Sequence, residues 1–522
     1  MKNMDASRAV VDSSSVAIRR PAWRRVQWLG WVLLVAATTW ISAQAHRQAG
    51  FTLPPPWNDE PWVLWSSIAL AEHGTFYSES LHPERVVPRE PTYQVPLALL
   101  FKLTGFSYAK ARWVSWVYLM LAYAGMLALV KSRPLPMVSA AVVSLFFLGV
   151  NAVVAGNMAR QESMVWMLAV WSFVLVDRGH GWKALAVAGL AVLTHQLGLV
   201  YFGGIFLLFL LNAWEQRGNV RPSKGDLGFM AVAGAVLIGQ ILFMWANWGA
   251  ILADWTQAYG ESFQQNVWGR LFASNQTPWL LALAVFSVVG LGGARRLRAP
   301  ALLGLCAYLV PLLRPQMWYE LYAAMAYLLL ALLIPWALAG IVDKAVETWA
   351  VPRSGLAKTA LRGAVFLVGL LPMLKFSYAH GFITGPRNYP EKLGWGWGMR
   401  MDDPTPYLTE RDVQAVVREI EKHVADGKKR RVFFMPEGDG LFFHGRLPAN
   451  AIPYQGVRTQ VLGDMAVFRF SRHFPAWWRD QHALKYLRMY GGEGRVPFYE
   501  RDGTESWILV PPRAGPDAGG GP

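Results

Sequence analysis

The sequence is poor in cysteine and in charge. Its one cysteine, Cys306, lies inside an apolar run, and we interpret it as a small core residue. A single cysteine excludes a disulfide framework and a cluster of thiolates around a metal. Only 16% of the 522 residues are charged, whereas 54% are hydrophobic and 26 are tryptophan. This composition excludes an ordinary soluble globular protein.

Motifs for nucleotides and for common hydrolases are absent as well. The sequence has no Walker loop, no dinucleotide fingerprint, no His-Glu-x-x-His pattern and no Gly-x-Ser-x-Gly elbow. Nucleotide-driven chemistry therefore has no visible site, and we expect no cofactor. A divalent cation held by Asp59, Glu60 or Glu90 is the alternative that these carboxylates leave open.

The net charge of +16 raises the question of a nucleic-acid partner. The Lys and Arg residues do not gather in one soluble segment, however. They lie between apolar runs, near residues 19–25, 131–133, 178–183, 217–224, 295–298 and 344–358. Placing all these segments in the cytoplasm satisfies the positive-inside rule. The charge therefore sets topology, and we expect no nucleic-acid partner.

The apolar runs predict a polytopic α-helical membrane protein with a soluble tail. We expect a basic cytoplasmic segment at 1–25, a transmembrane domain at 26–377 with a large outer loop at 45–106, a small extracytoplasmic α/β domain at 378–513 and a flexible end at 514–522. About eleven spans fit, at roughly 20 residues each. They lie near 26–43, 108–130, 135–155, 163–176, 184–194, 198–213, 227–248, 278–290, 301–313, 321–341 and 361–375.

An odd number of spans puts the N-terminus inside and the tail outside. The two segments on either side of His195 leave one alternative open, because they could form one broken helix and not two spans. Losing that crossing would move the tail to the cytoplasm. In the tail, the pattern predicts helices at 409–425 and 474–489 and strands at 431–435, 465–470 and 506–510. We expect the tail to cap the outer cavity and to order an acceptor.

The first outer loop holds two adjacent carboxylates, Asp59 and Glu60, in the stretch Trp57-Asn58-Asp59-Glu60-Pro61-Trp62. Pro61 suits the first turn of a helix, which we expect to run over 63–73 and to stop at Gly74. A second short apolar segment at 93–103 is expected to lie in the membrane interface, since it is too short to span.

Asp59 is the first candidate for chemistry. A carboxylate beside a partly dry cavity can act as a general base toward an acceptor hydroxyl or amine. The alternative is a helix cap, because Asp and Asn are favoured at helix N-termini for local reasons. Glu60 either orients a substrate hydroxyl or favours the helix dipole.

Further charged residues are expected on the same side. Arg160, in a short turn with Glu162, suits a phosphate through its planar fork, or else anchors the interface. His195 interrupts an apolar run, and it either faces a cavity or is a hydrogen-bonded residue at a helix break. The remaining candidates, each equally open to a structural role, are Arg314 as a second phosphate ligand, with Tyr319, Glu320, Arg89, Glu90 and Arg112.

Taken together, these motifs resemble the integral-membrane glycosyltransferases of the C superfamily (GT-C), which include protein O-mannosyltransferases and aminoarabinose transferases. The matching order is a basic N-terminus, one span, Asp-Glu opening an outer helix that ends near Gly74, and Ala111-Arg112 at the next span. Three later segments are similar to bacterial members: Arg160-Gln161-Glu162, Thr194-His195-Gln196-x-Gly198, and Arg314 to Tyr327.

The resemblance implies an inverting transferase in a bacterial inner membrane. Its donor would be a sugar on a polyprenyl phosphate, its acceptor an envelope lipid, glycan or protein, and its base the acid that maps onto Asp59. Basic side chains would stabilise the leaving phosphate. Pro61-Trp62 stands where the family commonly has Tyr, and Gln161 where Pro is usual, so the sugar and the acceptor stay open.

Two other function classes remain. A lipid or sugar transporter, or flippase, would make no bonds and would more typically show broken helices in two symmetric halves. A membrane scaffold with a binding tail is the third class, and the charged residues of the outer side argue weakly against it.

Overall fold

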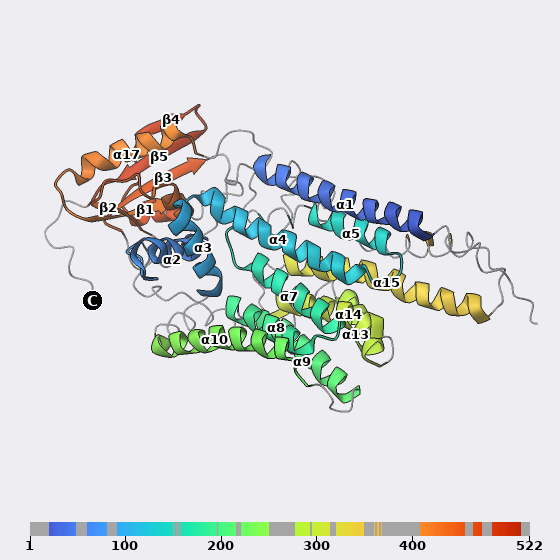
Figure 1. Ribbon diagram of the computed structural model, residues 1–522. Coiled ribbons are helices and arrows are strands. Elements are labelled where there is room, and N and C mark those ends of the chain that lie inside the picture. The colour runs from blue at the N-terminus through green and yellow to red at the C-terminus, as the bar shows by residue number, and fades with distance from the viewer. Residues whose placement is uncertain are drawn as a thin grey trace, which may run out of the picture.

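The computed structural model describes residues 20–48, 60–80, 91–149, 158–195, 197–215, 221–249, 277–292, 295–313, 320–348, 408–454, 463–471 and 483–512, with a few isolated positions between them. These residues form a helical bundle and a small mixed sheet with its own helices. Figure 1 shows the sheet beyond one end of the bundle, next to α2 (Glu60–His73) and α3 (Pro91–Thr104).

The bundle is built around α7, which packs on four other helices. Its helices are α1 (Arg20–Gln48), α4 (Tyr108–Val130), α5 (Pro136–Phe147), α7 (Glu162–Asp177), α8 (Gly181–Thr194), α9 (Gly198–Glu215), α10 (Lys224–Ala246), α13 (Thr277–Gly292), α14 (Arg295–Leu313) and α15 (Glu320–Thr348). Large side chains such as Trp166 and Phe146 are buried where these helices meet, and Cys306 is a buried core residue as expected.

Three described helices are long and apolar enough to cross a membrane: α4, α9 and α10. The expectation of about eleven spans is therefore wrong for this part of the chain. Four further apolar helical stretches have only 10–17 residues in the described part of the chain. Two of these, α5 and α8, have 12 and 14 residues, and runs of about that length are more typical of buried core helices than of spans.

Helix α10 has the character of a lipid-facing element. Gln240 is its only buried residue, although the structure describes the whole helix. Beyond its first turn, the other residues of α10 are apolar or glycine, and Val232 and Trp245 are 69% and 82% exposed. A continuous apolar surface of this kind marks contact with a membrane or with another protein.

Helices α2 and α3 confirm the two short helices expected in the first outer loop. Gly74 and Gly105 follow them with φ of +69° and +73°. The left-handed conformation suits glycine and ends a helix by turning the chain away. Both helices bury apolar side chains against the start of α4, in a cluster that includes Trp65, Leu97 and Ala111.

The tail folds as an α/β domain with strand order β2-β1-β3-β5-β4. Its elements are α17 (Glu410–Val424), β1 (Arg430–Met435), the 3-10 helix η5 (Glu437–Phe443), β2 (Ala451–Tyr454), β3 (Met465–Ser471), α19 (Leu484–Met489), β4 (Tyr499–Arg501) and β5 (Glu505–Val510). Strand β1 pairs in parallel with β2 and β3, whereas β5 is antiparallel to β3 and β4.

Alternation along the strands gives this sheet two covered faces. Val432 and Phe434 of β1 pack in the cluster that includes α17, whereas Phe433 and Met435 pack in the cluster that includes α19. Successive strand residues point to opposite faces, so both sides are apolar. The expected strands β1, β3 and β5 are confirmed, and the expected helix at 474–489 is described only as α19.

Candidate functional site

The buried carboxylate of Glu60 is the centre of the polar network at the sheet-facing end of the bundle. Glu60 is the first residue of α2 and is 0% exposed. Its Oε1 accepts hydrogen bonds from the backbone N–H of Ala159 at 2.6 Å and from Nε of Arg112 at 3.3 Å. Its Oε2 accepts from Nη2 of Arg112 at 3.0 Å and from the hydroxyl of Tyr108.

The partners of Glu60 are arranged by α4. Tyr108 and Arg112 are four residues apart, so they lie on one face of this helix. Nη2 of Arg112 also donates to the Tyr108 hydroxyl at 2.5 Å, and its guanidinium lies 4.3 Å from the centre of the Tyr108 ring. A buried ion pair is tolerated when extra hydrogen bonds saturate both charges. Glu60 therefore fixes the start of α2 against α4 and the turn before α7.

That turn also carries Arg160 and Glu162. The guanidinium of Arg160 donates two hydrogen bonds to the carboxylate of Glu162, at 2.5 and 3.1 Å. The Arg160 carbonyl lies 3.5 Å from the hydroxyl of Ser115, which is 2.8 Å from the hydroxyl of Tyr93 on α3. Burial raises the pKa of Tyr93 well above its ordinary value, so its phenol stays protonated. The turn is thus tied to both α3 and α4.

His195 ends α8 at a tight turn into α9. It is 4% exposed, and its Nδ1 accepts the backbone N–H of Leu197 at 3.1 Å. A Cβ on Gly198 would lie 2.2 Å from the carbonyl carbon and oxygen of Ala191, so only glycine fits there. Because α8 and α9 pack against each other, they are two helices and do not form one broken helix.

A second polar junction ties this turn to α3 and α10. The Thr92 hydroxyl on α3 lies 3.0 Å from the Leu193 carbonyl and 3.1 Å from Oε1 of Gln240. The Gln240 side-chain amide also donates to the Leu193 carbonyl, at 3.1 Å. Gln240, the one buried residue of α10, therefore gives a hydrogen-bond donor to a backbone carbonyl at the C-terminal end of α8, beside His195.

The tail domain docks on the same end through η5. Leu441 is buried in the cluster of α2, α3 and α4, and the Phe442 ring lies 5.4 Å from the ring of Tyr108. His444 packs against Trp65, with ring centres 5.4 Å apart, and its Nε2 lies 3.0 Å from Oε1 of Glu72. The structure thus brings the tail together with α2, α3 and the start of α4, next to Glu60.

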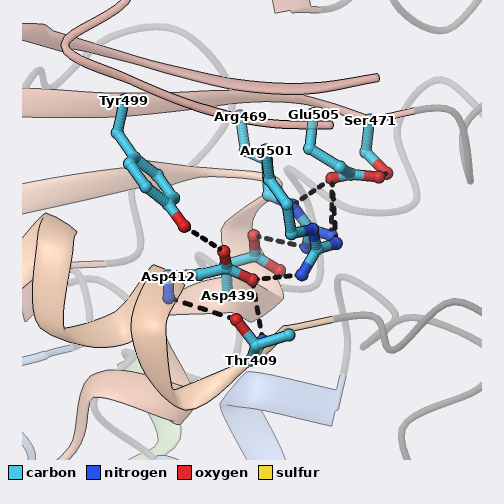
Figure 2. Close-up of polar contacts among 8 residues, drawn as sticks. All are labelled: Thr409, Asp412, Asp439, Arg469, Ser471, Tyr499, Arg501 and Glu505. Carbon is cyan, nitrogen blue, oxygen red and sulfur yellow. Dashed lines mark hydrogen bonds and ion pairs between the residues drawn. The ribbon is translucent and has the colours of Figure 1, made fainter. Parts of the chain in front are cut away.

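Inside the tail, a buried polar network holds η5 to the sheet (Figure 2). Arg469 of β3 pairs with Glu505 of β5 at 2.9 Å and with Asp439 of η5 at 3.3 Å, and all three side chains are at most 4% exposed. The Ser471 hydroxyl donates to Glu505 at 2.6 Å. Through Asp439, this network fixes the segment that contacts α2.

The same network reaches α17. Asp412 is bonded by Arg501 and by the Tyr499 hydroxyl, the latter at 3.1 Å. Asp412 also accepts the backbone N–H of Thr409 at 2.7 Å, and the Thr409 hydroxyl accepts the N–H of Asp412 at 3.3 Å, which is a capping box. These groups orient the first turn of α17 on the sheet.

Several expected site residues lie outside the described residues, namely Asp59, Arg89, Glu90, Arg314 and Tyr319. Of the remaining candidates, the structure brings Glu60, Arg112, Arg160 and Glu162 together and places His195 at a separate turn. Glu320 is the first residue of α15, and its side chain lies outside the described part of the chain. Among the described residues no three His, Cys, Asp or Glu side chains converge as a metal site would require. Sequence reasoning missed Tyr93, Tyr108 and Ser115, although the spacing of Tyr108 and Arg112 on one helix face was a usable signal.

The sequence matches no protein-family model and no curated protein sequence. Function is therefore argued from the residues and their geometry.

Proposed function

We propose that this protein is an inverting membrane glycosyltransferase of the GT-C type. It moves a sugar from a polyprenyl-phosphate donor to an envelope lipid, glycan or protein, with Asp59 as general base and no cofactor. The observation that carries the proposal is the buried cluster of Glu60, Arg112, Tyr108 and the Ala159 N–H. It immobilises the start of α2, one peptide bond from Asp59.

A general base works only when it is held within hydrogen-bond reach of the proton that it removes. Four donors hold the Glu60 carboxylate, and they come from α4 and from the turn that carries Arg160. Glu60 is therefore a positioning residue in this proposal, because its oxygens are occupied by protein donors. The anchored helix start is a rigid support of the kind on which precise catalytic geometry depends.

In the proposed reaction, Asp59 accepts the proton of the acceptor hydroxyl or amine as that group attacks the anomeric carbon. The bond between the anomeric carbon and the phosphate oxygen breaks, and the lipid phosphate leaves with its electron pair. Arg160, oriented by Glu162, stabilises the negative charge that develops on the phosphate, a task that suits the planar guanidinium. Arg314 is the second residue proposed for this role.

The proposed location is a bacterial inner membrane, with the N-terminus in the cytoplasm and the tail domain outside. Two observations support this arrangement. Helices α4, α9 and α10 are compatible with membrane spans. The tail contacts α2, so in this proposal the tail and the first outer loop share one side of the membrane. In this position the tail covers the reaction site and orders the acceptor.

The test is the variant Asp59→Asn, which keeps the shape of the side chain and removes its basicity. Full-length protein in membranes would be given a radiolabelled sugar on polyprenyl phosphate and an envelope extract, and released polyprenyl phosphate would be measured. We expect at least a hundredfold loss, given the roughly 10²–10⁴-fold contribution of a general base. Glu500→Gln, an exposed carboxylate on β4, is the matched control and should keep wild-type turnover.

Each outcome separates the alternatives. Equal turnover in Asp59→Asn and wild type would refute Asp59 as the base. If wild-type protein releases no lipid phosphate from any donor, transfer chemistry is refuted. The transporter alternative is then tested by the movement of labelled lipid across proteoliposomes.

A further inference from the structure

A basic cavity lies at the end of the bundle opposite Glu60. It has a volume of about 470 Å³, and it is lined by the turn after α4, the end of α7 and the start of α14. Helix α4 begins beside Glu60 and has 23 residues. At a rise of about 1.5 Å per residue, the cavity is therefore roughly 35 Å from the Glu60 carboxylate along this helix.

Positive charge dominates the cavity. Its lining contains Lys131, Arg133, Arg178, Arg295 and Arg296, but only one carboxylate, that of Asp177.

Two of these cations have a carboxylate partner. Asp177 pairs with Arg133 at 2.6 Å, and Arg295 pairs with Glu215 at 3.0 Å. Among the described residues, Lys131, Arg178 and Arg296 have none. The cavity thus gathers three exposed positive charges without a carboxylate partner, and an anion bound among them would lower their mutual repulsion.

One of the cations is built into the wall of the cavity. The Arg133 side chain is only 4% exposed, and its Nη2 is fixed by Asp177. Its buried Nε has no hydrogen-bond partner in the part of the chain that the structure describes. A buried guanidinium with an unused donor is costly, which makes this cavity different from a set of solvated lysines at a helix end.

We propose that this cavity binds a phosphate group, and that the phosphate is the headgroup of an anionic phospholipid. Guanidinium forks match phosphate geometry, and two guanidinium groups, those of Arg178 and Arg296, join Lys131 here without a carboxylate partner among the described residues. The volume falls in the usual range of ligand sites. The positive-inside rule assigns this basic end to the cytoplasm, where anionic lipids are enriched and basic pockets between helices bind their headgroups. The proposal is independent of the proposed transferase chemistry.

The test compares two double variants of the full-length protein in detergent. Arg178→Gln with Arg296→Gln removes two cations from the cavity. Arg221→Gln with Lys224→Gln removes two exposed cations before and at the start of α10, outside the cavity lining. Native mass spectrometry would follow the binding of phosphatidylglycerol to each protein. In a parallel arm, inorganic phosphate would be added as a competitor. Thermal unfolding would verify that both variants fold.

We expect wild type and the control variant to bind phosphatidylglycerol with affinities within about twofold. The cavity variant should bind at least tenfold more weakly, since each basic residue near an anionic lipid surface contributes a factor of roughly five. Equal weakening in the two variants, or no retained lipid in wild type, would overturn the site. If inorganic phosphate alone binds wild type, and does so only with the cavity cations present, the lipid assignment is overturned and a soluble phosphate compound takes its place.

Discussion

Breaking the ion pair between Glu60 and Arg112 should destabilise the sheet-facing end of the bundle strongly. Both side chains are 0% exposed, so solvent does not screen the interaction. In Glu60→Gln the side-chain NH2 group replaces one carboxylate oxygen and cannot accept a hydrogen bond. It must therefore face a group that donates to Glu60 in wild type, either the Ala159 N–H or the Tyr108 hydroxyl. The guanidinium of Arg112 is left buried without a counter-charge. Removing one partner of a buried pair costs about 3–5 kcal/mol.

The same reasoning predicts that a double replacement is much milder. Arg112→Met alone strands the Glu60 carboxylate and should cost about 3–5 kcal/mol. Together, Glu60→Gln and Arg112→Met remove both charges and leave groups of similar volume. The double variant leaves no buried charge without a partner, which is the main cost of each single variant. The two substitutions should therefore show a coupling energy of at least about 3 kcal/mol in favour of the double variant.

The assay is a double-mutant cycle on the full-length protein. Unfolding by sodium dodecyl sulfate in mild detergent would be followed by tryptophan fluorescence for wild type, both single variants and the double variant. Contacting residues that interact give non-additive free energies, whereas independent ones add within about 0.3–0.5 kcal/mol. Additive costs in the double variant would refute the claim that Glu60 and Arg112 stabilise each other. They would also remove the support that α2 gives to Asp59.

Two further predictions concern other parts of the chain. Gly198→Ala should lower the thermal unfolding temperature in detergent, because the added methyl group would lie 2.2 Å from the Ala191 carbonyl. The control is Gly189→Ala in α8, where the space is open; it should cost no stability or add up to about 1 kcal/mol. Equal effects of the two substitutions would contradict the tight turn at Gly198. Burial raises the pKa of Tyr490 above its ordinary value, so its contribution to stability is complete below about pH 10 and is lost as the pH rises further. The thermal unfolding temperature of wild type should therefore fall more steeply above about pH 10 than that of Tyr490→Phe. Parallel plots of unfolding temperature against pH for the two proteins would contradict this.

Local patterns predicted the elements of the tail well. Short apolar runs predicted β1, β3 and β5, and the helical periodicity of residues 409–425 predicted α17. Strands β2 and β4 were missed because they have only four and three residues, and β2 contains Pro453. Such short strands are defined by their neighbours in the sheet, which a single sequence does not display.

The candidate site was predicted only in part, for a related reason. Adjacent carboxylates and the helix that follows them are local features, and they drew attention to Glu60. Its partners Arg112 and Ala159 are 52 and 99 residues away along the chain, so their pairing depends on how α4 and α7 pack. The predicted number of spans was wrong because hydropathy does not distinguish a short buried helix from a short membrane-spanning helix.

Tyr108 belongs to two contacts at once. Its hydroxyl bonds to Glu60 inside the bundle, and its ring meets Phe442 of the tail. Lifting the tail would uncover that ring and let water reach the Glu60–Arg112 pair, which would raise the local dielectric constant and weaken the pair. Domain closure and the strength of this ion pair are thus thermodynamically linked. Whatever holds the tail closed also tightens the start of α2, and the effect is reciprocal.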